Sequence, residues 1–188
     1  MKKIFLASFL FVTLISLNAQ TYQSAVIEKT DKDGMQYEIL GKINNHIWIY
    51  KKNGNLSTIA QYNEQMQLVK QNDLSFLPAN VRSLEFVVGK QNVYAVFQFF
   101  NQTTGYIVAA AIDQQGQLVG APKILDSAQN VRPGTYAKIF NLIESENKQK
   151  LAVFRVNTTK TNHIKVHVNR FDEGFENAAE TEISINSN

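Results

Sequence analysis

Short runs of hydrophobic residues, separated by turn residues, fill most of the chain after residue 20. Some runs alternate apolar and polar residues and others are apolar throughout, and both patterns are typical of β-strands. Asp33-Gly34 and Asn53-Gly54 are turn dipeptides that favour β-hairpins. The pattern predicts strands over residues 24–30, 35–40, 46–52, 56–62, 66–70, 83–88, 93–100, 106–112, 117–125, 138–143, 151–157, 163–171 and 179–185. The stretch 141–149 also fits a turn of helix.

The first residues carry a different pattern. Two lysines precede an unbroken apolar run over residues 4–15, and the small residue Ala19 lies directly before Gln20. This order is typical of a secretory signal peptide cleaved between Ala19 and Gln20. A membrane-spanning helix needs about 20 apolar residues, so the run is too short for one. We therefore expect residues 1–19 to be a signal peptide, and the mature chain to be exported to the periplasm or the extracellular space without a membrane span.

Composition and charge exclude several classes of function. Without the two signal-peptide lysines, the 19 Lys and Arg residues become 17, against 16 Asp and Glu residues. The longest basic run is Lys51-Lys52, whereas a nucleic-acid-binding surface needs clustered cations. The chain has no cysteine, which excludes thiolate catalysis, Cys-ligated metals and disulfides. Residues 20–188 are predicted to form a single β-rich repeat domain.

One short segment recurs along the chain. Residues 63–69 and 113–119 are identical at four of seven positions, and residues 172–176 form a third copy with fewer matches. Each copy lies at a turn between two predicted strands, and Asn or Asp opens such turns because its side chain caps nearby amides. The repeating unit is about four strands long, a period typical of propeller blades.

The hairpin over 112–119 resembles the Asp-x-x-Gly-x-Leu corner of secreted bacterial β-propeller repeats, and the strand pattern extends this resemblance over residues 36–185. The resemblance implies a fold and carries no activity with it. Closed propellers have four to eight blades. The predicted fold class is therefore all-β, with about three four-stranded antiparallel repeats in a partial or open propeller that a homodimer could close. A β-barrel or sandwich meander is the alternative.

Burial can also be predicted from the strands. Residues 93–100, 106–112 and 151–156 are mostly apolar on both alternating faces, so each strand should be covered on both faces. Residues 163–169 alternate, which predicts one polar face in contact with solvent. Trp48, the single tryptophan, lies within an apolar strand and is expected in the core.

Histidine and acidic residues are the candidate metal ligands of the chain. His163 and His167 have a spacing that suits one metal on a helix, but on a strand they lie about 13 Å apart. We therefore expect both on a solvated strand face, and His46 at a turn. Asp31 and Asp33 resemble part of a calcium loop whose required glutamate is missing, which favours a plain hairpin turn.

The acidic residues and serines also lack a catalytic arrangement. Neighbouring acids in one turn do not converge across a cleft as glycosidase carboxylates do, and we interpret the following five as solvated turn residues: Asp172, Glu173, Glu176, Glu144 and Glu146. The chain has no Gly-x-Ser-x-Gly elbow and no glycine-rich phosphate loop. The sequence thus predicts no catalytic, metal-binding or cofactor-binding residue.

These observations favour a non-catalytic extracytoplasmic binding or interaction module for a protein or glycan. Two alternatives remain open at this stage. The chain could be an incomplete propeller fragment without independent function, or a hydrolase with a site on unrecognised loops.

Overall fold

The computed structural model describes residues 34–131, 138–146, 149–158, 163–176 and 179–186. The expected signal peptide with its cleavage pair Ala19 and Gln20, the strand over 24–30 and the acidic residues Asp31 and Asp33 lie outside these ranges. Their assignments stay predictions.

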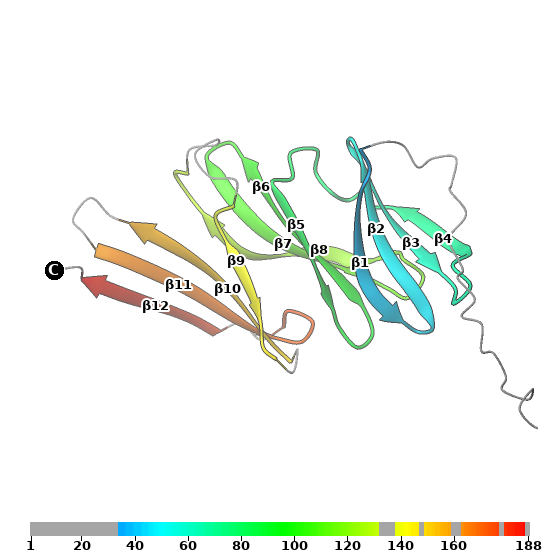
Figure 1. Cartoon of the computed structure of the whole chain (residues 1–188). Helices are drawn as coiled ribbons and strands as arrows, with labels where there is room; N and C mark the ends of the chain where they lie inside the picture. Colours follow the sequence, from blue (N-terminus) through cyan, green and yellow to red (C-terminus); the bar gives the residue numbers. More distant parts are fainter. Residues whose placement is uncertain (1–33, 132–137, 147–148, 159–162, 177–178, 187–188) are drawn as a thin grey trace, which may run out of the picture.

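Within these ranges, twelve strands form three four-stranded antiparallel sheets, each built from four consecutive strands (Figure 1). The first sheet contains β1 (Gln36–Ile43), β2 (His46–Asn53), β3 (Leu56–Tyr62) and β4 (Leu68–Asp73). The second sheet contains β5 (Ser83–Val88), β6 (Val93–Asn101), β7 (Thr104–Ile112) and β8 (Leu118–Ala128). The third sheet contains β9 (Asn141–Glu144), β10 (Lys150–Thr158), β11 (His163–Asp172) and β12 (Ala179–Asn186).

This arrangement confirms the predicted all-β fold class. None of the three sheets closes on itself into a barrel, and their succession along the molecule is consistent with a propeller-like arrangement (Figure 1). The helical turn considered for 141–149 is wrong. Residues 141–144 instead pair with residues 151–154 of β10, because this pairing turns Leu142 toward the hydrophobic core.

The second sheet is the centre of the molecule because both of its faces are covered. One face packs on the first sheet, where the central contacts come from Trp48, Tyr50, Ile59, Val93, Ala95 and Ile112. The other face packs on the third sheet, where the core includes Val96, Ile107, Ala109, Leu151, Val153 and Phe171. Successive residues of a strand point to opposite faces, so an apolar run such as β6 serves both cores. This confirms the two-sided burial predicted for 93–100 and 106–112, and Trp48 is 1% exposed.

The three segments that are similar in sequence form turns of one kind. In each, the N–H of the first residue donates to the carbonyl of the fifth, and the N–H of the fourth donates to the carbonyl of the first. The fourth residue has a left-handed backbone in all three, with φ of 55° at Met66, 75° at Gly116 and 60° at Phe175. A three-residue hairpin loop ending in a left-handed residue has this geometry.

The second and third of these turns also connect neighbouring sheets. Asn72 of β4 donates from Nδ2 to the carbonyl of Gln115 at 2.9 Å and accepts at Oδ1 from Gln117 Nε2 at 2.8 Å. In the turn after β11, the Glu173 carboxylate accepts from the Lys90 backbone N–H at 2.8 Å. Neighbouring sheets are therefore held together by polar contacts at the turns in addition to the apolar cores.

The turn at Gly116 gives a testable prediction. A Cβ atom at Gly116 would lie 2.4 Å from Asn72 Nδ2, whereas one at Gly120 would meet nothing within 4 Å. Both glycines have a left-handed backbone, so Gly116→Ala and Gly120→Ala share a strain cost of about 1 kcal/mol. Gly116→Ala should cost about 1–2 kcal/mol more in urea unfolding, because it displaces the hydrogen-bonded Asn72. Equal losses for the two variants would contradict the contact.

Candidate functional site

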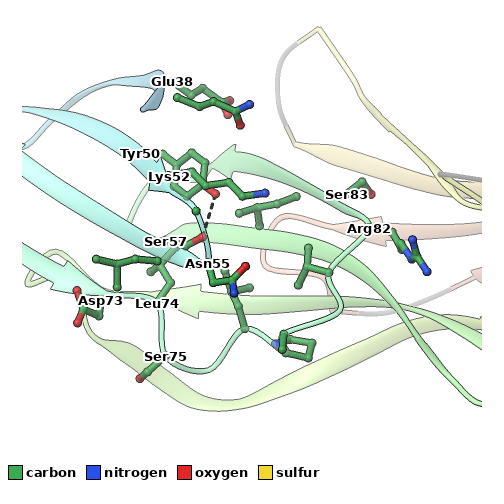
Figure 2. A pocket seen from close by; sticks show the side chains of 18 of the residues that line it. Glu38, Tyr50, Lys52, Asn55, Ser57, Asp73, Leu74, Ser75, Arg82 and Ser83 are labelled. Carbon is green, nitrogen blue, oxygen red and sulfur yellow. Dashed lines mark hydrogen bonds between the residues drawn. The ribbon is translucent and has the colours of Figure 1, made fainter. Parts of the chain in front are cut away.

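A hollow of about 580 Å³ lies beside the packed faces of the first and second sheets (Figure 2). Its lining comes from the start of β1, the hairpin between β2 and β3, the connection over residues 74–82, and the start of β5. We refer to it as the inter-sheet pocket. Its volume lies within the range of small-molecule sites in proteins, about 300–1,000 Å³.

The first sheet provides a polar wall to the pocket. Antiparallel register places Glu38 opposite Tyr50, and Lys52 opposite Ser57, on the face turned toward the second sheet. The Tyr50 hydroxyl and Ser57 Oγ are hydrogen-bonded at 3.1 Å (Figure 2). The Tyr50 ring packs against Phe86 with 5.0 Å between ring centroids. Packing therefore holds this ring in place and leaves its hydroxyl at the wall.

The connection over 74–82 supplies an apolar wall. Leu77 and Val81 pack together with Leu84 against Phe97 of the second sheet. Two internal hydrogen bonds hold this connection, from Leu77 N–H to the Leu74 carbonyl at 3.0 Å and from Val81 N–H to the Pro78 carbonyl at 3.3 Å. The pocket is therefore formed by packed side chains and hydrogen-bonded backbone.

Desolvation shifts two ionisable groups of the pocket. Burial raises the pKa of the Glu38 carboxyl, and the nearby Glu85 carboxylate raises it further. Burial also raises the pKa of the Tyr50 phenol, although its hydrogen bond with Ser57 acts in the opposite direction. Tyr50 therefore stays protonated at neutral pH and can both donate and accept a hydrogen bond.

Two cations complete the pocket. Lys52 extends from the polar wall, and Arg82 lies at the far end, with its guanidinium carbon 5.9 Å from the centre of the Phe100 ring (Figure 2). The Asn55 amide, from the hairpin between β2 and β3, lies between the two walls (Figure 2). Hydrogen-bond donors and acceptors of both charge signs thus converge over apolar side chains.

The carboxylates of the pocket are not placed for glycoside hydrolysis. Glu38 is on β1 and Asp73 is on β4, the two edge strands of the first sheet, and they lie at opposite sides of the pocket (Figure 2). Three strand spacings separate these edges, or about 14 Å. Glycosidase carboxylates lie about 5–9.5 Å apart.

The acidic residues singled out in the sequence do not converge in one site either. Asp172 pairs with Lys150 on the neighbouring strand, and Glu173 reaches the second sheet through Lys90. Glu144 lies on β9, two strands from Asp172. Glu146 and Glu176 are exposed. Glu173 is therefore an inter-sheet contact, which its position in a turn did not predict.

His167 is placed differently from the solvated strand face predicted for it, and this prediction is wrong. Its side chain is only 12% exposed, with Nε2 3.5 Å from Glu180 Oε1 and 3.9 Å from Asp126 Oδ2. Arg155 Nε lies 3.2 Å from the same Asp126 oxygen. The polar face of β11 packs against β8, where Asn169 is also buried, so alternation there marks a polar contact between sheets.

Of the other two histidines, the structure describes the side chain of His46 alone. His46 is half-buried at the start of β2, paired with Ile43, and the side chain of His163 lies outside the described part of the chain. Among the described residues, no three His, Cys, Asp or Glu side chains are grouped to hold a metal ion.

The sequence did not predict the inter-sheet pocket. Among its polar residues, Tyr50, Lys52 and Asn55 come from one hairpin, whereas Glu38 and Arg82 come from other segments, and the five share no motif. The only available signals were the turn at Asn53-Gly54 and the break between the strands predicted over 66–70 and 83–88.

The fold defines an all-β protein of three stacked four-stranded antiparallel sheets. No family model matches the chain, and comparison with curated proteins and with solved structures gave no match. Across the described ranges, no helix is long and apolar enough to cross a membrane.

Proposed function

We propose that the protein is a non-catalytic binding module that acts outside the cytoplasm and holds its ligand in the inter-sheet pocket. The observation that carries this proposal is the convergence of Glu38, Tyr50, Lys52, Asn55 and Arg82 on one pocket held in place by packed side chains. Pockets that combine apolar walls with a few placed polar groups are the usual form of small-ligand sites. Export rests on the signal-peptide pattern of residues 1–19.

The chemistry of the pocket favours one sugar residue of a glycan as the ligand. A sugar presents hydroxyl groups that both donate and accept hydrogen bonds, and it also has an apolar C–H face. The Tyr50 hydroxyl and the Asn55 amide can each donate and accept, while Glu38 accepts and Arg82 donates. Leu77 and Val81 offer apolar contact for the C–H face. A ligand without hydroxyl groups would leave these polar groups unpaired.

The separation of the acids supports binding without turnover. The distance of about 14 Å between the strands of Glu38 and Asp73 disfavours a paired-carboxylate mechanism. Hydrolysis would require a catalytic pair elsewhere.

The test is direct binding of the purified full chain to an array of neutral, acidic and amino-sugar oligosaccharides, followed by calorimetric titration of those that bind. Glu38→Gln and Arg82→Ala should each weaken binding at least about tenfold, since each removes a charged hydrogen bond. Glu146→Gln, at an exposed turn of the third sheet, is the matched control and should bind as wild type.

Three results would contradict the proposal. They are binding that neither pocket substitution changes, no binding to any oligosaccharide, and cleavage of a bound oligosaccharide seen by mass spectrometry. Capture of a peptide by the same pocket would replace the glycan as ligand.

A further inference from the structure

The third sheet has one covered face and one open face. Leu151 and Val153 of β10 point to the second sheet and are 3% and 0% exposed, whereas Val156 points away and is 51% exposed. Register extends the open face across the sheet, because Val156 pairs with Val166 and Val166 pairs with Ile183. We call this surface the outer face of the third sheet, and its apolar residues include Ile143, Phe154, Val156, Val166, Ile183 and Ile185.

The open face of β10 does not match the pattern of its sequence, which is apolar on both faces. The pattern of 151–156 predicts a strand covered on both faces, and within the described ranges only one face of β10 has a sheet against it. Ile143, Ile183 and Ile185 are also exposed, by 55%, 49% and 48%. Monomeric proteins rarely expose contiguous apolar patches above a few hundred Å² without using them. The sequence of β10 therefore predicts that its outer face is buried against a partner.

The other two sheets show how such a face is used in this chain. The first sheet packs on the second through the side of β2 that carries Trp48 and Tyr50. The second sheet packs on the third through the side of β6 that carries Tyr94 and Val96. β2, β6 and β10 are each the second of four consecutive strands in their sheet. The face of β10 that corresponds to these two contact faces is the outer face of the third sheet. The face that contacts the next sheet in the first two sheets therefore has no sheet against it in the third, within the described ranges.

We propose that the outer face of the third sheet binds a second copy of this chain, in a symmetric dimer with the two outer faces packed together. With about 3.4 Å per residue and 4.8 Å between strands, β9 to β12 cover roughly 500 Å². Two such faces together have a flat area of about 1,000 Å². Because side chains protrude from the sheet, the accessible area that the dimer buries is larger and falls in the range of specific interfaces, about 1,200–2,000 Å².

The distribution of charged residues also favours an apolar partner. Lys165, Glu180 and Glu182 of β11 and β12 lie on the side that faces the second sheet, where Lys165 Nζ and Glu182 Oε1 are 2.8 Å apart. Among the described side chains of the outer face, the charged ones, Lys150, Arg170 and Asp172, lie together at one end, where Lys150 and Asp172 form an ion pair. A hollow of about 520 Å³ lies at that end, between Ile143 and Ala179. The rest of the outer face is mostly apolar.

At the opposite end of the stack, the central strands of the first sheet present little open surface. On the far side of the first sheet, Lys51, Thr58, Ala60 and Tyr62 are each less than a tenth exposed. An outer face therefore finds its best complement in another outer face. Such pairing of identical surfaces closes at two copies.

The first experiment measures the mass of the full chain by light scattering over a range of concentrations. Wild type should have twice the monomer mass. Ile183→Lys should raise the dimer dissociation constant at least about tenfold, because symmetry places the lysine in the interface twice. Ile124→Lys, at a 58% exposed strand position of the second sheet, should remain dimeric. A monomeric wild type, or an Ile183→Lys dimer of unchanged affinity, would overturn the proposal.

A second experiment does not depend on a disruptive substitution. Because the chain has no cysteine, Ile183→Cys and Ile124→Cys each carry one thiol. The Ile183→Cys thiol should react more slowly with a thiol reagent as the protein concentration rises, while the rate for Ile124→Cys should stay constant. Rates independent of concentration in both variants would refute the dimer. Neither readout uses a glycan, so the dimer and the proposed ligand can fail separately.

Discussion

Trp48→Ala is expected to lower the free energy of unfolding by about 3–5 kcal/mol. The indole is 1% exposed and packs in the core between the first and second sheets together with Ile59, Val93 and Ile112. Removing it takes a large apolar surface out of the core and leaves a cavity that the strands on both sides cannot fill without moving.

Urea unfolding followed by far-ultraviolet circular dichroism measures this loss, since the variant has no tryptophan fluorescence. Tyr37→Ala is the control in the same sheet, because Tyr37 is 53% exposed and should change stability by less than about 1 kcal/mol. A loss below about 1 kcal/mol for Trp48→Ala would show that this core does not carry the stability of the fold.

The second large effect is expected from Gln98→Leu, at about 2–4 kcal/mol. Gln98 is 4% exposed in β6, and its amide makes three hydrogen bonds to the segment before β9. Nε2 donates to the Phe140 carbonyl at 2.7 Å, and Oε1 accepts from the N–H groups of Ile139 and Phe140 at 3.1 and 3.0 Å. Leucine has a similar size but would leave the Phe140 backbone groups buried without partners, at about 1–3 kcal/mol each.

The control for Gln98→Leu is Gln71→Leu, the same substitution at an exposed position of β4, which should stay within about 0.5 kcal/mol of wild type. Hydrogen exchange of the Phe140 amide adds a local readout, because its protection depends on Gln98 Oε1. If the amide of Phe140 stays protected in Gln98→Leu, the hydrogen bonds are not what holds this segment.

Much of the fold could be predicted because strand periodicity is a local property. The range predicted over 56–62 coincides with β3, and 93–100 differs from β6 by a single residue. Turn chemistry fixed the boundaries, since residues such as Asn63 and Asp113 cap their own turns with side-chain hydrogen bonds. Contacts between sheets were not predictable in the same way. His167 and Asn169 follow the pattern of a solvated face, yet β8 supplies polar partners for both.

The candidate site could not be predicted for a related reason. Glu38 and Arg82 are 44 positions apart and become neighbours of one pocket only after the first sheet packs on the second. Neither position has a sequence motif, because a binding pocket needs no fixed spacing along the chain. The outer face of the third sheet is an intermediate case. Its apolar residues were visible in the sequence, but only the topology shows that they point away from the second sheet.

The central position of the second sheet determines how the molecule comes apart. Because β6 and β7 contribute side chains to both cores, detaching either neighbouring sheet exposes apolar residues that had been buried on that side. The first and third sheets share no core, but both pack on the second sheet. Each therefore raises the free-energy cost of detaching the other from the second sheet. We therefore expect the three sheets to unfold as one cooperative unit, with the innermost amides exchanging with solvent only when the whole stack opens.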